Sequence, residues 1–89
     1  MIRATATINN KLGLHARASA KLTKLAGSYQ FEVHMARSGR RINAKSIMGV
    51  MMLAAGLGSE VDLETDGPDE QAAMDALLAL IIDKFGEGQ

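Results

Sequence analysis

The segment YQFEVHMARSGRRINAK, residues 29–45, contains two strands joined by a short turn and decides the class of the fold. Apolar and polar side chains alternate in its first part, with the apolar phase formed by Tyr29, Phe31, Val33 and Met35. This alternation is typical of a strand with one buried face. The strand carries two of the three aromatic residues, so we expect it to cross the centre of the core. Residues 37–40, Arg-Ser-Gly-Arg, are typical of a hairpin turn. Residues 41–45 then return antiparallel, with Ile42 and Ala44 facing inward.

Two further strands and a helix are predicted around this hairpin. Residues 2–8 and 60–65 alternate in the same way and are expected to be strands. Residues 16–27 place apolar side chains on one helix face, at positions 18, 22, 25 and 26. Gly27 is a suitable helix end because glycine adopts a left-handed cap without steric cost.

Two more helices complete the pattern. A short one is expected to begin after Ser46 and to end near Gly56. The last is expected to have Pro68 at its first helical position and to run to Lys84, with a wide buried face that includes Leu78 and Ile82. The resulting order, β-α-β-β-α-β-α, predicts an α+β domain in which an antiparallel sheet has its helices on one face.

Length and composition exclude several classes of protein. A chain of 89 residues is expected to form a single domain over residues 1–89. It has no cysteine, which excludes a disulfide framework and a thiolate metal site. No apolar run approaches the roughly 20 residues of a membrane span, and the first residues lack the apolar stretch of a signal peptide. We therefore expect a cytoplasmic protein that does not insert into a membrane.

The formal net charge of zero hides a divided chain. Residues 1–45 contain nine Lys or Arg and one acid, a net of +8, whereas residues 46–89 contain one base and nine acids, a net of −8. This division predicts one basic face directed at acidic partners or phosphate. Arg3 and Lys11 need not belong to that face.

His15 is the candidate for chemistry, because it stands immediately before the first helix with Arg17 two residues later. A helix start offers unpaired amide N–H groups and a partial positive charge, which suit an anion, and Arg17 can hold phosphate with two hydrogen bonds. The same field favours a neutral, nucleophilic ring. A metal site is not indicated, because no second ligand lies near His15 in the sequence. A hydrolytic triad is not indicated either, because no Ser/Asp pair is placed to work with His15. On position alone, a loop histidine that only caps the helix is the alternative, and His34 is expected to be an ordinary exposed residue.

Ser46 and the methionines after it mark a second region of interest. Ser46 is expected to be the N-cap of the short helix, a role worth about 1 kcal/mol. A phosphate there would gain from the helix dipole and would add about two negative charges to a basic neighbourhood. Met48 and Met51 suit either the core or an exposed docking surface, since methionine adapts its shape.

Two motifs together resemble the histidine-containing phosphocarrier family HPr of the bacterial phosphotransferase system. They are Gly13-Leu14-His15-Ala16-Arg17-Ala18 and Lys45-Ser46-Ile47-Met48-Gly49-Val50-Met51. The resemblance covers essentially the whole chain in length, element order and the separation of the motifs. It implies an open-faced β-sandwich, with a four-stranded antiparallel sheet and three helices on one side.

The resemblance also implies a function. His15 would accept phosphate on Nδ1 from phosphorylated enzyme I and pass it to an enzyme IIA domain, while Arg17 stabilises the phosphate. The protein would then be a stoichiometric carrier, with no cofactor and no turnover of its own, and we expect a monomer. Ser46 matches the regulatory serine that HPr kinase/phosphorylase modifies. The residues implied in partner docking are Ala16, Ala20, Lys21, Lys24, Lys45, Ile47, Met48 and Met51.

Three alternatives stay open at this stage. The nitrogen-branch carrier often called NPr shares the fold and the histidine, so the branch is not decided. A module that binds RNA through Arg37, Arg40 and Arg41 would lack aromatic stacking partners on the same surface. An interaction protein that has lost the chemistry is disfavoured because His15 and Arg17 are both present.

Overall fold

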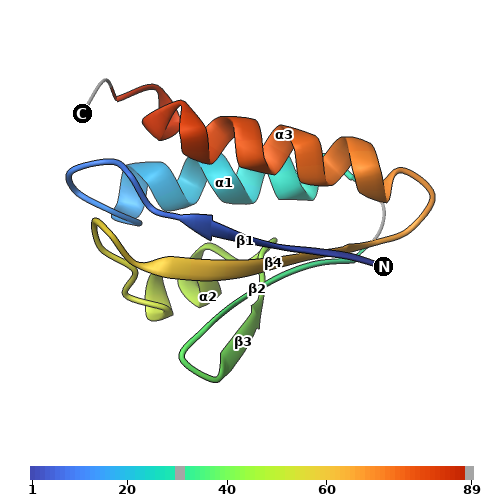
Figure 1. Ribbon diagram of the computed structural model, residues 1–89, viewed down its shortest axis with the longest axis horizontal. Helices are drawn as coiled ribbons and strands as arrows, with labels where there is room; N and C mark the ends of the chain where they lie inside the picture. The colour runs from blue at the N-terminus through green and yellow to red at the C-terminus, as the bar shows by residue number, and fades with distance from the viewer. Residues whose placement is uncertain (30–31, 88–89) are drawn as a thin grey trace.

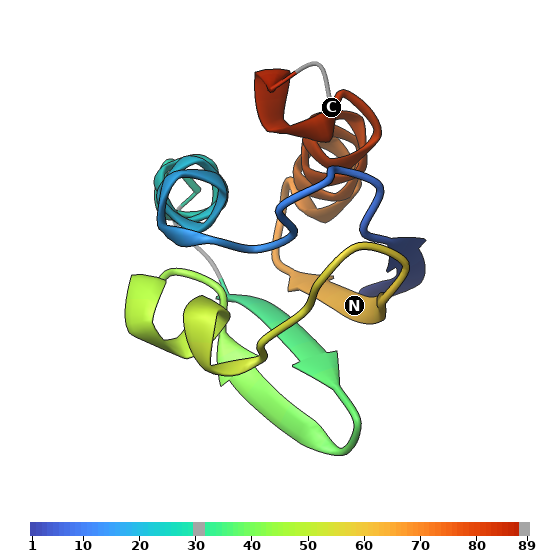
Figure 2. The ribbon, with the colours of Figure 1, turned by 90° about the vertical axis from the view of Figure 1, so that its left-hand side faces the viewer.

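The computed structural model describes residues 1–29 and 32–87 as a four-stranded antiparallel sheet with three α-helices on one face (Figures 1 and 2). The strands are β1 (Ile2–Thr7), β2 (Glu32–Arg37), β3 (Arg40–Asn43) and β4 (Glu60–Asp66). The helices are α1 (Ala16–Gly27), α2 (Ile47–Met52) and α3 (Glu70–Ile82), followed by a short 3-10 helix η1 (Lys84–Gly86). This arrangement confirms the predicted α+β open-faced sandwich.

The strand order β1-β4-β2-β3 places the first strand beside the last one. All three pairings are antiparallel, and β4 lies between β1 and β2, with Thr65 opposite both Ile2 and Val33. Two backbone bonds continue the β1–β4 pair beyond its end. Ile8 N–H donates to Ser59 O, and Gly58 N–H donates to Ile8 O, each at 2.8 Å. The loop after β1 is therefore fixed against the loop before β4.

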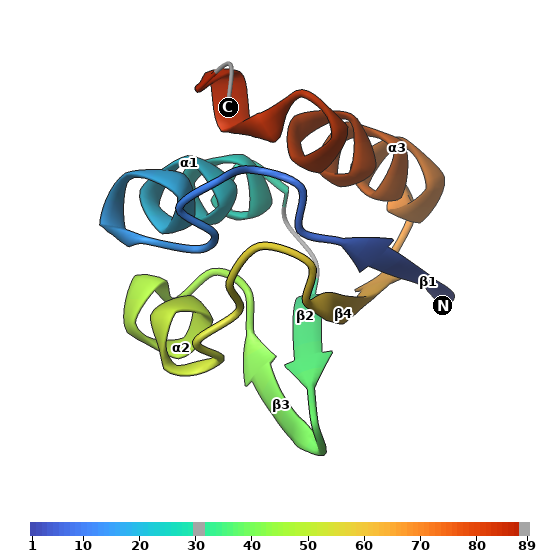
Figure 3. The ribbon, with the colours of Figure 1, turned by 60° about the vertical axis from the view of Figure 1, so that its left-hand side comes forward.

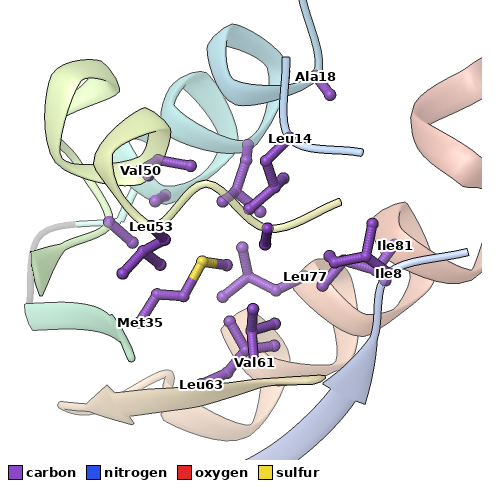
Figure 4. Packing of buried hydrophobic residues seen from close by; sticks show 14 of the residues in the cluster. Ile8, Leu14, Ala18, Met35, Val50, Leu53, Val61, Leu63, Leu77 and Ile81 are labelled. Carbon is purple, nitrogen blue, oxygen red and sulfur yellow. The ribbon is translucent and has the colours of Figure 1, made fainter. Parts of the chain in front are cut away.

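The core lies between the sheet and the helices (Figure 4). Its largest fully buried side chains are Phe85, Ile8, Leu22, Met35, Leu63, Met74, Leu77 and Ile81. Burial of a side chain of this size contributes roughly 1.5–3 kcal/mol. Helix α2 contacts α1 and β3 at one end of the sheet (Figure 3).

The predicted hairpin is confirmed with shifted ends. Val33 and Met35 are fully buried, as the alternation requires, and so is Ala44, while Ile42 is only half-buried. Tyr29 precedes β2, and Phe31 lies outside the described residues. The aromatic ring that the described structure places in the core is that of Phe85, which periodicity did not indicate.

Four details predicted for the last two helices were wrong. Helix α2 ends at Met52, well before Gly56. Pro68 lies in the turn before α3, whose N-cap is Asp69, and Lys84 follows the helix in η1. Ile82 is 71% exposed. The buried side of α3 consists of Ala73, Met74, Leu77 and Ile81, and Leu78 packs partly buried against the core.

Glu64 connects three strands on the open face of the sheet. Arg41 of β3 donates from Nε and Nη2 to its two carboxylate oxygens, each at 3.2 Å, and Arg3 of β1 lies 3.8 Å away. The bonds from Arg41 hold the pKa of the Glu64 carboxyl below its ordinary value, although partial burial opposes this. The carboxylate therefore contributes stability mainly above the ordinary pKa of a glutamate.

Glu64→Gln should reduce the pH dependence of stability. Because the pKa of Glu64 is lowered on folding, its contribution is present above about pH 4.5 and is lost as the pH falls through the lower folded value. Urea unfolding from pH 7 to 3 should show the largest difference between wild type and Glu64→Gln at neutral pH, shrinking in acid. Glu60→Gln, on an exposed position of the same strand, is the control. Parallel pH profiles for wild type and Glu64→Gln would contradict this interpretation.

Candidate functional site

His15 is the N-cap of helix α1. Its backbone is extended, with φ −74° and ψ −179°, and its Nδ1 accepts a hydrogen bond from Arg17 N–H at 3.2 Å. The Nδ1 lone pair therefore points at the amide groups of the first helical turn. The side chain is 28% exposed, so the ring is accessible from solution. His15 can therefore cap the helix and still offer its ring for chemistry.

Gly13 allows the loop before His15 to lie against another loop. Its φ is +66°, and a β-carbon at this position would lie 2.5 Å from Ala55 O and 2.6 Å from Gly56 Cα. The next residue uses this close approach, since Leu14 N–H donates to Ala55 O at 2.8 Å and the Leu14 side chain is buried. The position of His15 is consequently fixed by backbone contacts on the residue before it.

Glu87 contacts His15 from the other end of the chain. Its Oε2 lies 2.5 Å from His15 Nε2, and its Oε1 accepts from Asn10 Nδ2 at 3.0 Å. The Asn10 amide holds the pKa of the Glu87 carboxyl below its ordinary value; partial burial opposes the shift and the contact with His15 adds to it. Glu87 is therefore a carboxylate at neutral pH. Nothing in the sequence pattern pointed to Asn10 or Glu87, which lie 77 positions apart.

A shallow cavity of about 440 Å³ opens beside this pair and is lined by Lys11, Leu12, Arg17, Gly86 and Glu87. The structure thus places Lys11 on the wall of the same cavity as Arg17, although the charge pattern alone did not require Lys11 to join the basic face. Two cations therefore line a cavity whose wall also includes Glu87, the residue that contacts His15. This arrangement can receive an anion of the size of phosphate.

Two of the predicted docking lysines have backbone partners. Lys21 Nζ donates to Phe85 O at 2.6 Å, and Lys45 Nζ donates to Tyr29 O at 2.8 Å. Their charges remain, but their side chains are held in place. Ala16, Ala20 and Lys24 are exposed on α1.

Ser46 is the N-cap of α2, as predicted. Its Oγ accepts from Gly49 N–H at 3.2 Å, and the residue is exposed. The apolar residues after it are also exposed, Ile47 to 38%, Met48 to 66% and Met51 to 39%. Between the two possibilities left open for Met48 and Met51, the structure thus favours an exposed surface over the core.

Within residues 1–29 and 32–87, no group of three or more His, Asp or Glu residues is arranged to hold a metal ion. None of the helices in this part of the chain is long and apolar enough to cross a membrane. His34, the second histidine, lies on β2 opposite Glu64, is half-buried rather than exposed, and belongs to the open sheet face. The described structure therefore brings His15, Arg17 and Lys11 together with Glu87 and leaves His34 apart.

Comparisons with known proteins find relatives of this chain by sequence and by structure. The family described as "PTS HPr component phosphorylation site" matches residues 2–83. The phosphocarrier protein HPr of Cupriavidus necator is 71% identical over 89 residues, and that of Neisseria meningitidis is 53% identical over 89 residues, with both chains covered completely in each case. A crystal structure of HPr from Thermoanaerobacter tengcongensis is similar with a TM-score of 0.94, at 41% identity and 98% coverage of each chain.

Gly13→Ala should destabilise the protein by more than the strain of placing alanine in a left-handed backbone conformation. Both Gly13 and Gly39 have positive φ, but a β-carbon at Gly39 meets nothing within 4 Å. Gly39→Ala is therefore the control for backbone strain, at about 1 kcal/mol, and Gly13→Ala should lose about 2–4 kcal/mol because it also adds a backbone clash. Equal losses in urea unfolding would show that the close approach to Ala55 is unimportant.

Proposed function

The chain belongs to the HPr family of the phosphotransferase system, and on that premise we propose that His15 receives phosphate from phosphorylated enzyme I and donates it to an enzyme IIA domain. The general role of a phosphotransferase-system phosphocarrier follows from the family. The observation that carries the residue assignment is the partly exposed His15 ring, whose Nδ1 lone pair lies at the start of α1. The protein acts as a stoichiometric carrier in the cytoplasm, with no cofactor and no turnover of its own.

The site suits the temporary binding of phosphate. When Nδ1 forms a bond to phosphorus, the Arg17 N–H that it accepts in the free protein becomes available to a phosphate oxygen. The partial positive charge of the helix start and the guanidinium of Arg17 stabilise the added negative charge, and Lys11 lines the same cavity. Because the group stays near solvent, a partner can reach it and remove it.

A docking surface on α1 and α2 surrounds the acceptor. It consists of Ala16, Ala20, Lys21, Lys24, Lys45, Ile47, Met48 and Met51. Helices α1 and α2 are in contact, and the members of the surface are exposed except for Lys45, which is half-buried. The lysines attract acidic partner proteins, and the adaptable methionines allow one surface to fit enzyme I and an enzyme IIA domain in turn. The protein works as a monomer, because each partner must reach the same face.

Ser46 is the proposed regulatory site, modified by HPr kinase/phosphorylase. Its hydroxyl is exposed at the start of α2, so a phosphate can be added without unfolding the helix. The added charge lies beside the docking residues Lys45 and Ile47. It is expected to weaken the encounter with an acidic partner.

His15→Ala should abolish phosphate transfer. Incubation of the wild-type protein with phosphoenolpyruvate and enzyme I should give an acid-labile, base-stable phosphate, which is characteristic of phosphohistidine. His34→Ala removes the other histidine, on the sheet, and should be labelled at the wild-type rate. Labelling of His15→Ala at the wild-type rate would show that the acceptor is another residue. The enzyme IIA domain that takes the label would identify the sugar or the nitrogen branch.

Ser46→Asp should slow transfer from enzyme I several-fold at low salt, with a smaller effect at high salt because exposed charges are screened. Aspartate is a good N-cap, so the variant adds charge without removing the helix cap. Ser46→Ala is the matched control: it loses about 1 kcal/mol of stability but should transfer at nearly the wild-type rate. Unchanged kinetics of Ser46→Asp at low salt would argue against electrostatic regulation at this position.

A further inference from the structure

Glu87 contacts the His15 ring through the nitrogen that does not face the helix. Its Oε2 lies 2.5 Å from Nε2, while Nδ1 accepts the N–H of Arg17. A ring nitrogen that accepts a hydrogen bond carries no hydrogen, and a carboxylate can only accept. The neutral ring therefore has its hydrogen on Nε2, which donates it to Glu87. This leaves the lone pair on Nδ1.

Glu87 is itself held in position. Its side chain is only 13% exposed, and its Oε1 accepts from Asn10 Nδ2. Asn10 is fully buried, and the same Nδ2 donates to Gly13 O at 2.8 Å, which fixes the orientation of the amide. One buried side chain thus connects the loop that leads to His15 with the carboxylate that contacts the ring.

A left-handed turn brings Glu87 to this place. Lys84, Phe85 and Gly86 have φ of 55°, 56° and 75°, a conformation that residues other than glycine rarely adopt. The turn persists because the Phe85 ring is fully buried and the ammonium of Lys21 donates to Phe85 O at 2.6 Å. The segment after α3 therefore has a defined path, and this path ends against His15.

We propose that Glu87 is a positioning residue for phosphate transfer: it selects the Nε2–H tautomer of His15 and stabilises the positive charge of the phosphorylated ring. The transfer role rests on the proposed function, whereas the tautomer role concerns the free protein.

The charge balance of phosphate transfer explains why Glu87 would stabilise the phosphorylated ring. The neutral ring, with hydrogen on Nε2, attacks phosphorus through the Nδ1 lone pair. The bond between phosphorus and the donor group of enzyme I breaks, and its electron pair returns to the donor. The His15 ring then carries a positive charge, and its Nε2–H still donates to the Glu87 carboxylate. When the phosphoryl group leaves, the electron pair returns to Nδ1 and no proton has moved at Nε2.

Glu87→Gln tests the proposal, because it replaces one of the two accepting oxygens with an NH2 group, which can only donate. Asn10 Nδ2 and His15 Nε2–H both donate to this side chain, and a glutamine has one accepting atom. Nitrogen-15 NMR of the free protein should show the Nε2–H tautomer dominant in wild type and a raised Nδ1–H population in Glu87→Gln. The initial rate of labelling by phosphoenolpyruvate and enzyme I should fall by about tenfold. Glu87→Asp, which keeps the carboxylate, should recover part of both signals.

Asp83→Asn is the matched control, since it removes one negative charge from an exposed residue just before the same turn. It should match wild type in tautomer and in rate, and circular dichroism should show all the variants folded. A wild-type tautomer ratio together with a wild-type rate in Glu87→Gln would overturn the proposal. An unlabelled wild-type protein would instead overturn the proposed function, and the NMR comparison would still decide whether Glu87 selects the tautomer.

Discussion

The close contact between two backbone loops determines where His15 and the start of α1 lie. Residues 8–14 lie against residues 55–59 through three backbone hydrogen bonds, two of which continue the β1–β4 pairing beyond the ends of the strands. The contact requires Gly13, because any side chain there would overlap with Ala55. Helix α1 begins two residues after this contact. The sheet therefore fixes the orientation of the helix start and of the histidine that caps it.

The ring of His15, the proposed acceptor, is held between two segments that lie far apart in the sequence. Its Nδ1 faces the first turn of α1, and its Nε2 faces Glu87, which arrives through a turn made by Phe85. The burial of Phe85 in the main core offsets the cost of that left-handed turn. The burial of Phe85 thus serves two purposes. Its ring fills the core, and it fixes the path of the segment that brings the Glu87 carboxylate to His15.

The division of the sequence into a basic and an acidic half does not by itself give the distribution of charge on the surface. Lys21 and Lys45 lie where the docking surface is proposed, but each ammonium also holds a backbone carbonyl. Arg41 pairs with Glu64 on the open sheet face, away from the helices. Lys11 lines the cavity beside Arg17. A zero net charge is therefore compatible with a local basic site.

The sequence by itself determined the element order, the two helix caps at His15 and Ser46 and the inward phase of β2, because these follow from residue spacing and local capping chemistry. It also predicted the pairing of His15 with Arg17, which are neighbours on one helix turn. The ends of α2 and α3 and the exposure of Ile82 were missed, since they depend on what packs against each helix. Only the tertiary structure decided that Asn10 and Glu87 lie beside His15. Glu87 contacts both Asn10 and His15 across more than 70 positions of the chain, and no local pattern encodes which distant side chains the packing of Phe85 brings together.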